Sequence, residues 1–381
     1  MRGRTSVVFG LLALALAGCA SNAGSAGGPP LGFARHDNAV SPPTVDGGYA
    51  RAGAGIRHLL TVGQCAIGVG VYENGYREVG ANWDGEGDCT TFSLPVNRPD
   101  SHGDRLPGQG GWDGSGLSAN GAVALSDGSV IGVDSSVQRL APDGTVTTLA
   151  DLHLPWHKPS DETGGTGRAN SVVQSGNRLV IGGGQTVGGH SGALMWTSTD
   201  GGHTLTPVDL PQADAYVGPM AASDNTVVAA ESSSGGGEFV TWRSTDSGQS
   251  WQRHEVPDVQ VNTSVGKVLR TDRGWLLVGS TQVQATQDRP FLASSPDGVT
   301  WTKIDTASLG LGWVTDATGG KDEDIVLVGR TTDNCGLVWT AAADGSWQRG
   351  ELGCDDAPSA VTTLADGRVI AVGLKDVWVR A

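Results

Sequence analysis

The sequence predicts an all-β fold, a seven-bladed β-propeller, on three observations. Glycine supplies 60 of the 381 residues and charged residues only 17%, a composition typical of many tight turns. A short β-run ending in a small residue occurs seven times, and its last residue is Gly68, Gly132, Gly182, Ala229, Gly279, Gly329 or Gly373. Spacings of about 40–50 residues, with no long segment of helical period, indicate blades of four short strands.

The N-terminal segment carries an export signal. Arg2 and Arg4 precede an apolar stretch, residues 7–17, that is too short to span a bilayer. Leu-Ala-Gly-Cys then follows at residues 16–19 and resembles the lipobox of bacterial lipoproteins. The resemblance implies a signal peptide over residues 1–18 and lipidation of Cys19. An ordinary secretory signal with an incidental cysteine is the alternative.

That resemblance also sets the domain organisation and the location. Residues 19–30 hold the lipidated cysteine and a Ser/Gly-rich tether, and residues 31–381 form one propeller. We expect the chain to be membrane-bound through its lipid and to face the extracytoplasmic side, at the cell surface or in the periplasm. No apolar run of transmembrane length follows the signal segment.

Four cysteines remain after Cys19, and an even number in an oxidising compartment predicts two disulfides. They are Cys65, Cys89, Cys335 and Cys354. Three pairings are open, and proximity in sequence favours 65–89 and 335–354. A zinc site is the rival interpretation, although no Cys-x-x-Cys spacing supports it.

A second repeated element, Ser-x-Asp-x-Gly-x-Thr-Trp, resembles the Asp-box (BNR repeat) of sialidases and other propellers. Its aspartates are Asp200, Asp246, Asp297 and, in a shortened copy, Asp344; eroded copies lie at residues 143–145 and 84–85. The resemblance implies a structural role, in which the carboxylate accepts backbone hydrogen bonds within a hairpin and the tryptophan packs on the next blade. We therefore expect none of these aspartates to be catalytic.

The last repeat, residues 357–381, has room for only three strands. A strand from within residues 31–50 is expected to complete it, so that strands from both termini close the ring and leave no open edge. Deletion of residues 31–50 is expected to abolish cooperative folding.

The order of strands a to d within a blade predicts which face is functional. The Asp-box hairpins join strands c and d, so the opposite face carries the b–c and d–a loops, whose lengths vary. Two d–a loops are long, at residues 98–116 and 153–170, and they mix aromatic and polar side chains that suit sugars, peptides or small polar ligands. Ordinary surface polarity is the alternative. The candidate ligand-binding residues on this face are Arg98, His102, Arg105, Trp112, His153, Trp156, His157, Arg168, Tyr72 and Tyr76. The b–c loops add further polar residues, namely Glu73, Arg77, His190, Glu231, Glu238, Arg289, Arg330 and Asp333.

Catalytic patterns are sparse. The Arg-Ile-Pro motif of sialidases is missing, and the tyrosines, at 49, 72, 76 and 216, leave the last third of the chain without one. Another glycoside hydrolase stays open, with Glu73, Asp161, Glu162, Glu231 and Glu238 on the eligible face. Pro155 lies between His153 and His157 and prevents the helix that would aim both at one metal.

These observations predict a monomeric interaction protein of the cell envelope that binds an envelope protein or a glycan. The net charge of −15 argues against a nucleic-acid partner. We expect no cofactor and no metal. The alternatives are an extracytoplasmic glycoside hydrolase and an assembly factor for a membrane complex.

Overall fold

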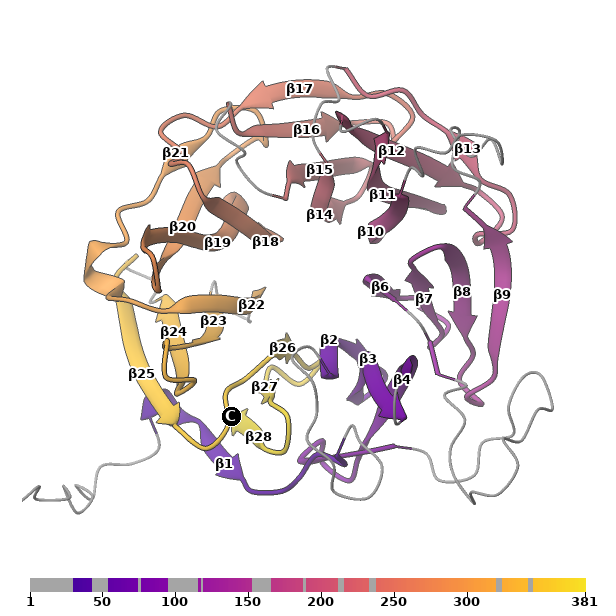
Figure 1. Cartoon of the computed structure of the whole chain (residues 1–381). Helices are drawn as coiled ribbons and strands as arrows, with labels where there is room; N and C mark the ends of the chain where they lie inside the picture. The colour runs from indigo at the N-terminus through magenta and orange to yellow at the C-terminus, as the bar shows by residue number, and fades with distance from the viewer. Residues whose placement is uncertain are drawn as a thin grey trace, which may run out of the picture.

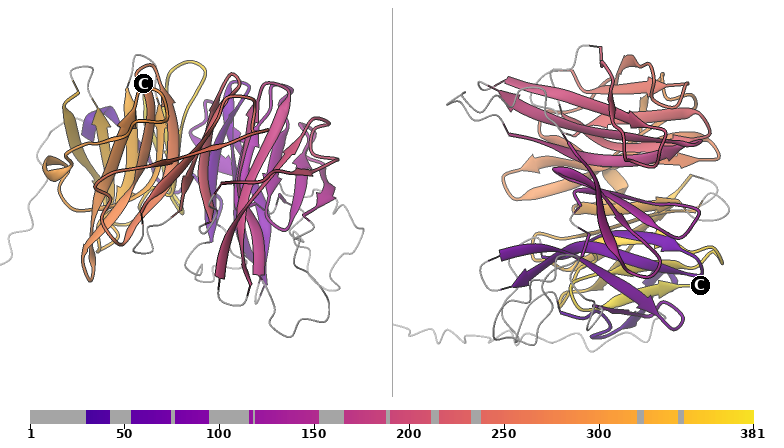
Figure 2. Two further views of the ribbon diagram at one scale, coloured as in Figure 1. Left: turned by 90° about the horizontal axis from the view of Figure 1, so that it is seen from above. Right: turned by 90° about the vertical axis from the view of Figure 1, so that its right-hand side faces the viewer.

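A computed structural model of the 381-residue chain describes residues 30–42, 54–74, 77–94, 116–117, 119–152, 166–187, 190–211, 216–232, 238–319, 324–341 and 345–381. Within them, seven antiparallel four-stranded sheets stand around a central axis (Figure 1). This arrangement confirms the predicted seven-bladed β-propeller. The strands run between the two faces of the ring (Figure 2).

The strands follow one another from the centre of the ring to its rim in every blade but the last (Figure 1). Blade 1 contains β2 (Gly55–Val62), β3 (Cys65–Asn74), β4 (Arg77–Glu86) and β5 (Thr91–Ser93). Blade 2 contains β6 (Gly121–Ala124), β7 (Val130–Val133), β8 (Ser136–Leu140) and β9 (Val146–Asp151). Blade 3 contains β10 (Thr166–Ser175), β11 (Arg178–Val187), β12 (His190–Ser198) and β13 (Thr206–Pro207). Blade 4 contains β14 (Val217–Ser223), β15 (Thr226–Glu231), β16 (Val240–Ser244) and β17 (Gln252–Glu255).

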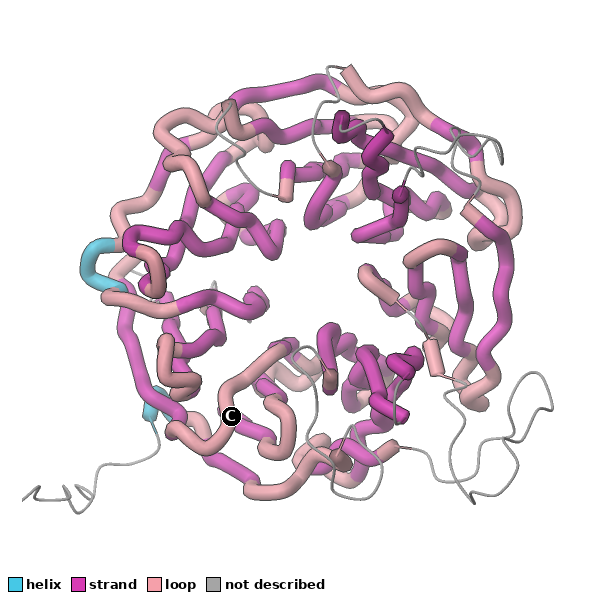
Figure 3. The backbone as a smooth tube through the Cα atoms, in the orientation of Figure 1, coloured by secondary structure: helices cyan, strands magenta, loops and turns pink. Residues whose placement is uncertain are grey.

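The remaining blades complete the ring. Blade 5 contains β18 (Thr263–Thr271), β19 (Gly274–Gln284), β20 (Gln287–Ser295) and β21 (Thr302–Lys303). Blade 6 contains β22 (Trp313–Gly319), β23 (Ile325–Arg330), β24 (Gly336–Ala341) and β25 (Trp347–Gly353). Blade 7 contains β26 (Ala360–Thr363), β27 (Val369–Val372), β28 (Val377–Arg380) and, outermost, β1 (Ala34–His36). Two short 3₁₀ turns, η1 (Pro30–Gly32) and η2 (Ala307–Leu309), lie at the rim (Figure 3); among the described residues no helix could cross a membrane.

Tryptophans form much of the packing between blades. Trp83, Trp242, Trp339 and Trp378 each come from the third strand of a blade and are fully buried. Trp251 and Trp301, which follow the repeated hairpins, are also buried. Large aromatic rings fill the wedge that widens between twisted sheets toward the rim, which accounts for the buried tryptophans among the described residues.

Ring closure follows the prediction. β1 pairs antiparallel with β28, with Ala34 opposite Val379. The buried carboxylate of Asp376 lies 2.5 Å from Arg35 Nη2 and accepts a hydrogen bond of 2.8 Å from the Asn38 N–H. Phe33, just before β1, is buried among side chains of blades 6 and 7. The N-terminal segment is therefore part of the last blade.

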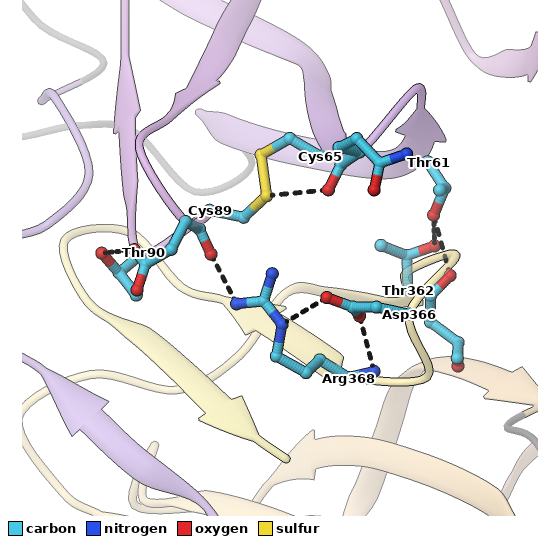
Figure 4. Close-up of a disulfide and its surroundings, with 10 residues drawn as sticks. Thr61, Cys65, Cys89, Thr90, Thr362, Asp366 and Arg368 are labelled. Carbon is cyan, nitrogen blue, oxygen red and sulfur yellow. Dashed lines mark hydrogen bonds and ion pairs between the residues drawn. A yellow bond between two sulfur atoms is a disulfide. The ribbon is translucent and has the colours of Figure 1, made fainter.

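The seam between blades 7 and 1 is held by polar contacts (Figure 4). Thr61 of β2 lies 3.0 Å from the Thr362 hydroxyl of β26, and Arg368 donates to the carbonyl of Asp88, in the β4–β5 turn, at 2.6 Å. The same turn holds Cys89, which is bonded to Cys65.

The structure confirms two disulfides, Cys65–Cys89 and Cys335–Cys354. One local expectation was wrong: the chain of blade 1 does not reverse at residues 84–85. Asp84 and Gly85 pair with Ser93 and Phe92 in the β4–β5 ladder, and the turn comes at residues 87–90. Asp-Gly is a frequent turn pair, but here the ladder continues through Glu86, one residue past the pair.

Charged side chains occur on the innermost strands as well. Lys267 of β18 lies 2.8 Å from Asp316 of β22, and Asp316 also accepts a hydrogen bond from the Val361 N–H of β26. His58 of β2 is close to this pair, and burial, with the positive charge of Lys267, lowers its pKa to about 4. The innermost strands of blades 5, 6 and 1 therefore carry a charged pair and a histidine that is neutral at neutral pH.

Candidate functional site

The aspartates of the repeated hairpins are occupied by local hydrogen bonds. Asp200 Oδ1 accepts from Ser198 Oγ and the Thr204 N–H, both at 2.8 Å. Asp246 and Asp297 accept equivalent bonds from a serine hydroxyl and two backbone N–H groups each. The donors of Thr204 hold the pKa of Asp200 well below its usual range. These carboxylates stabilise the tight turns on this face of the ring, and their oxygens are already used in hydrogen bonds within those turns. Asp344 lies outside the described residues.

The opposite face carries the exposed apolar side chains. Among the described residues, the large hydrophobic side chains that are exposed are Val261, Val283, Leu311, Trp313 and Leu374. All five lie in connections between blades, in second-to-third strand loops, or at strand ends beside them. We call this side the loop face. Of these five, Leu311 and Trp313 line one groove together.

A groove on the loop face lies between the β19–β20 loop of blade 5 and the β23–β24 loop of blade 6. It has a volume of about 670 Å³. Its lining includes Gln282, Gln287, Asp288, Leu311, Trp313, Arg330, Thr331, Thr332, Asp333, Asn334 and Arg349. We call it the blade 5–6 groove.

The floor of the groove is held by buried anchors on either side of its exposed residues. Leu309 of η2 is buried, and its carbonyl accepts a hydrogen bond of 3.0 Å from Trp339 Nε1. The Gly312 N–H donates to the Asp288 carbonyl at 2.8 Å. A Cβ at Gly312 would lie 2.5 Å from a Leu337 methyl group, so any larger residue at this position would have to displace buried side chains. The alternation of side chains then leaves Leu311 and Trp313, both 40% exposed, outside.

The blade 6 wall is fastened at several points. In the β23–β24 loop, the Thr331 N–H donates to the Cys335 carbonyl at 2.9 Å, and the Asn334 N–H donates to the Thr331 carbonyl. The Cys335–Cys354 disulfide ties the end of this loop to the end of β25. Thr332 Oγ1 donates to the Thr286 carbonyl of the opposite wall at 2.8 Å. The two walls are therefore connected and preorganised.

Charges of both signs line the groove. Arg330 donates to Asn334 Oδ1 at 3.3 Å, and Arg349 lies 3.5 Å from Glu351. Asp288 is half-buried, and burial raises the pKa of its carboxyl group. Within the described part of the chain, no hydrogen-bond donor or cation contacts that carboxylate. The half-buried carboxylate of Asp288 is therefore available to a donor that enters the groove.

Most residues predicted to bind ligand lie outside the described residues: Arg98, His102, Arg105, Trp112, His153, Trp156, His157 and Tyr76, and likewise Cys19. Two can be placed. Tyr72 lies in β3, and its side chain is buried in the blade 1 core. Arg168 is exposed but belongs to the innermost strand β10, which begins at Thr166, rather than to the long loop.

The groove residues were predicted unevenly. Arg330 and Asp333 belong to the loops that the sequence marked as eligible. Trp313 was missed, although it matches neither the hairpin position nor the buried third-strand position of the other tryptophans. This departure from the two repeating tryptophan positions was the feature of the sequence that could have marked Trp313 as a candidate binding residue.

Two eligible carboxylates lie away from the groove. Glu231 is buried, burial raises its pKa, and it accepts a hydrogen bond from the Val240 N–H at 3.2 Å. Glu238 lies 3.3 Å from Arg253. The described residues contain no group of three or more potential metal ligands.

Comparisons with known proteins show the fold. No protein-family model matches the sequence, and no curated protein matches it significantly. A streptogramin B lyase structure superposes with a TM-score of 0.55 at 14% identity, covering 92% of this chain and 97% of that one. The structure of YCF48 bound to D1 peptide superposes with a TM-score of 0.56 at 12% identity, covering 92% of this chain and 96% of that one. The GH74 enzyme of Niastella koreensis superposes with a TM-score of 0.57 at 10% identity, covering 87% of this chain and 53% of that one. At such identities the likeness concerns architecture alone, and by architecture the chain is a seven-bladed β-propeller.

Proposed function

We propose that the chain is an extracytoplasmic binding protein, held at the membrane by lipid on Cys19, whose loop face binds an envelope protein or a glycan. The observation that carries this proposal is the one-sided distribution of exposed apolar side chains, all on the loop face among the described residues. The other face presents tight turns whose carboxylates are already hydrogen-bonded. The blade 5–6 groove is the contact site, because it combines a volume of about 670 Å³, exposed Trp313 and the half-buried Asp288 carboxylate, which no donor of the described residues contacts.

The contact site is tested by affinity capture from envelope extracts with the full chain. A Leu311→Ser/Trp313→Ala variant changes two exposed side chains and no buried one. Asn177→Ala, in the exposed β10–β11 turn of the opposite face, is the control. We expect the double variant to lose a ligand that wild type and control retain. Identical profiles for all three proteins would refute the proposal.

The anchor is tested separately. Cys19→Ala is expected to abolish incorporation of labelled fatty acid and to release the chain from the membrane fraction, since a short tether without its lipid has no membrane affinity. An unchanged membrane fraction for this variant would contradict lipidation at Cys19.

A glycoside hydrolase is the second candidate, because Asp288 and Asp333 line one groove and burial raises the pKa of Asp288, as a general acid requires. Release of reducing ends from polysaccharides, lost on Asp288→Asn, would favour it. The fold shared with YCF48, solved with a D1 peptide, supports the third candidate, an assembly factor that recognises a peptide. Binding of envelope-protein peptides, with no bound sugar, would favour that candidate.

A further inference from the structure

We propose that the blade 5–6 groove binds a neutral oligosaccharide, with the Trp313 ring stacked on a sugar and Asp288 and Arg330 hydrogen-bonded to its hydroxyl groups. This inference rests on the proposed function and names the ligand class of the same site. The groove volume of about 670 Å³ lies within the range of about 300–1,000 Å³ that holds small ligands, so a few sugar units fit.

The stacking platform is Trp313, the one tryptophan among the described residues whose side chain is exposed. Its backbone is fixed by the β22–β23 ladder, where it pairs with Arg330. A Cβ at Gly329 would lie 2.0 Å from the Trp313 carbonyl oxygen, so the close approach of these strands depends on glycine. A rigid, flat aromatic ring at the surface matches the apolar C–H face of a pyranose.

The hydrogen-bonding groups around this ring suit hydroxyl ligands. Amide and hydroxyl side chains, which both donate and accept, are contributed by Gln282, Gln287, Thr331, Thr332 and Asn334. Sugar hydroxyls likewise donate and accept. Asp288 has no donor from the described protein, and two neighbouring hydroxyls of one sugar would supply two. Arg330 lines the same groove and is a further donor to sugar oxygens.

The charge and the lining of the groove favour a neutral oligosaccharide over a charged ligand or a peptide. Two arginines and two aspartates line the groove, so their formal charges cancel although the chain carries −15 overall. A strongly acidic or basic ligand would face an equal number of like charges. A peptide would bind through apolar side-chain pockets or an exposed sheet edge, and the larger apolar side chains of the groove are only Leu311 and Trp313.

The test is calorimetric titration of the full chain with neutral tetrasaccharides of glucose, xylose, mannose, galactose or N-acetylglucosamine. At least one is expected to bind the wild type. Trp313→Ala and Asp288→Asn are each expected to weaken that binding about tenfold, and Trp313→Phe, which keeps a ring, less than Trp313→Ala. Asn177→Ala on the opposite face should bind as the wild type does. Thermal unfolding of each variant shows whether it is folded. If Trp313→Ala is not folded, Asp288→Asn still tests the proposal.

Two results would overturn the inference. One is that no tetrasaccharide binds the wild type; the other is that Asp288→Asn and every folded Trp313 variant bind as tightly as the wild type. If peptides from a captured envelope protein bind in a Trp313-dependent manner while no sugar does, the oligosaccharide fails and the proposed binding face stands. If neither ligand depends on Trp313 and capture is also unchanged, both fail.

Discussion

Closure of the ring by the N-terminal segment is most directly tested by Phe33→Ala. The Phe33 side chain is 1% exposed and packs with Val328 and Val338 of blade 6 and with Trp378 of blade 7. Removing a fully buried phenylalanine ring costs about 3–5 kcal/mol. For the roughly 290 residues that the structure describes, the entropy of unfolding is about 0.6 kcal/mol/K, so the midpoint should fall by about 5–8 °C.

The assay is thermal unfolding of the full chain, followed by tryptophan fluorescence and by far-ultraviolet circular dichroism. Leu374→Ala removes an apolar side chain that is 42% exposed, and its midpoint should move by less than about 1 °C. Deletion of residues 31–50 should abolish the cooperative transition. A Phe33→Ala midpoint no lower than that of Leu374→Ala would show that the segment does not close the ring.

Three further perturbations follow from the described contacts. The pKa of His58 is about 4 in the folded protein against 6.5 for the free side chain. The free energy of unfolding should therefore be unaffected by this histidine above pH 6.5 and should fall by up to about 3 kcal/mol as the pH is lowered to 4. Urea titrations of His58→Gln should show a smaller decrease over the same pH range than those of the wild type. Gly312→Ala should lower the free energy of unfolding, measured by urea titration, by about 1–3 kcal/mol, because the added Cβ would lie 2.5 Å from a Leu337 methyl group. An unchanged free energy of unfolding would contradict this close contact. Replacing both Cys335 and Cys354 by serine should reduce calorimetric ligand affinity at the groove, whereas removing the other disulfide, far from the groove, should not.

The fold was predictable because each blade repeats the same physical solution. Short β-runs, small residues at strand ends and tryptophans of two repeating kinds all come from packing twisted sheets around an axis. The missing strand of the last blade also followed from counting, and β1 supplies it. Only the turn of blade 1 was misplaced, because a local Asp-Gly preference yielded to a ladder that extends past it.

The face that carries the candidate groove was predictable, but the place of the groove in the ring and its composition were not. The hairpin positions indicated the face, and Arg330 and Asp333 were expected on it. The long loops expected to bind ligand, residues 98–116 and 153–170, connect blades 1 to 3, whereas the groove lies between blades 5 and 6. The groove itself depends on loops of two blades that are remote in sequence and joined by the Thr332–Thr286 contact. Tyr72 shows the converse difficulty, since an aromatic residue near a loop is equally suited to the core, where it lies.

Carboxylates show most clearly what the sequence leaves undetermined. Asp246 and Asp288 are both aspartates close to turns of the ring, and composition cannot rank them. Asp246 accepts two backbone and two hydroxyl donors, and its pKa is lowered. Asp288 accepts none from the described protein, and burial raises its pKa. A saturated carboxylate has no free energy to gain from a ligand, whereas an unsaturated, partly desolvated one gains on meeting a donor. For this reason the repeated aspartates belong to the scaffold, and Asp288, which no repeat requires, is where ligand binding should be sought.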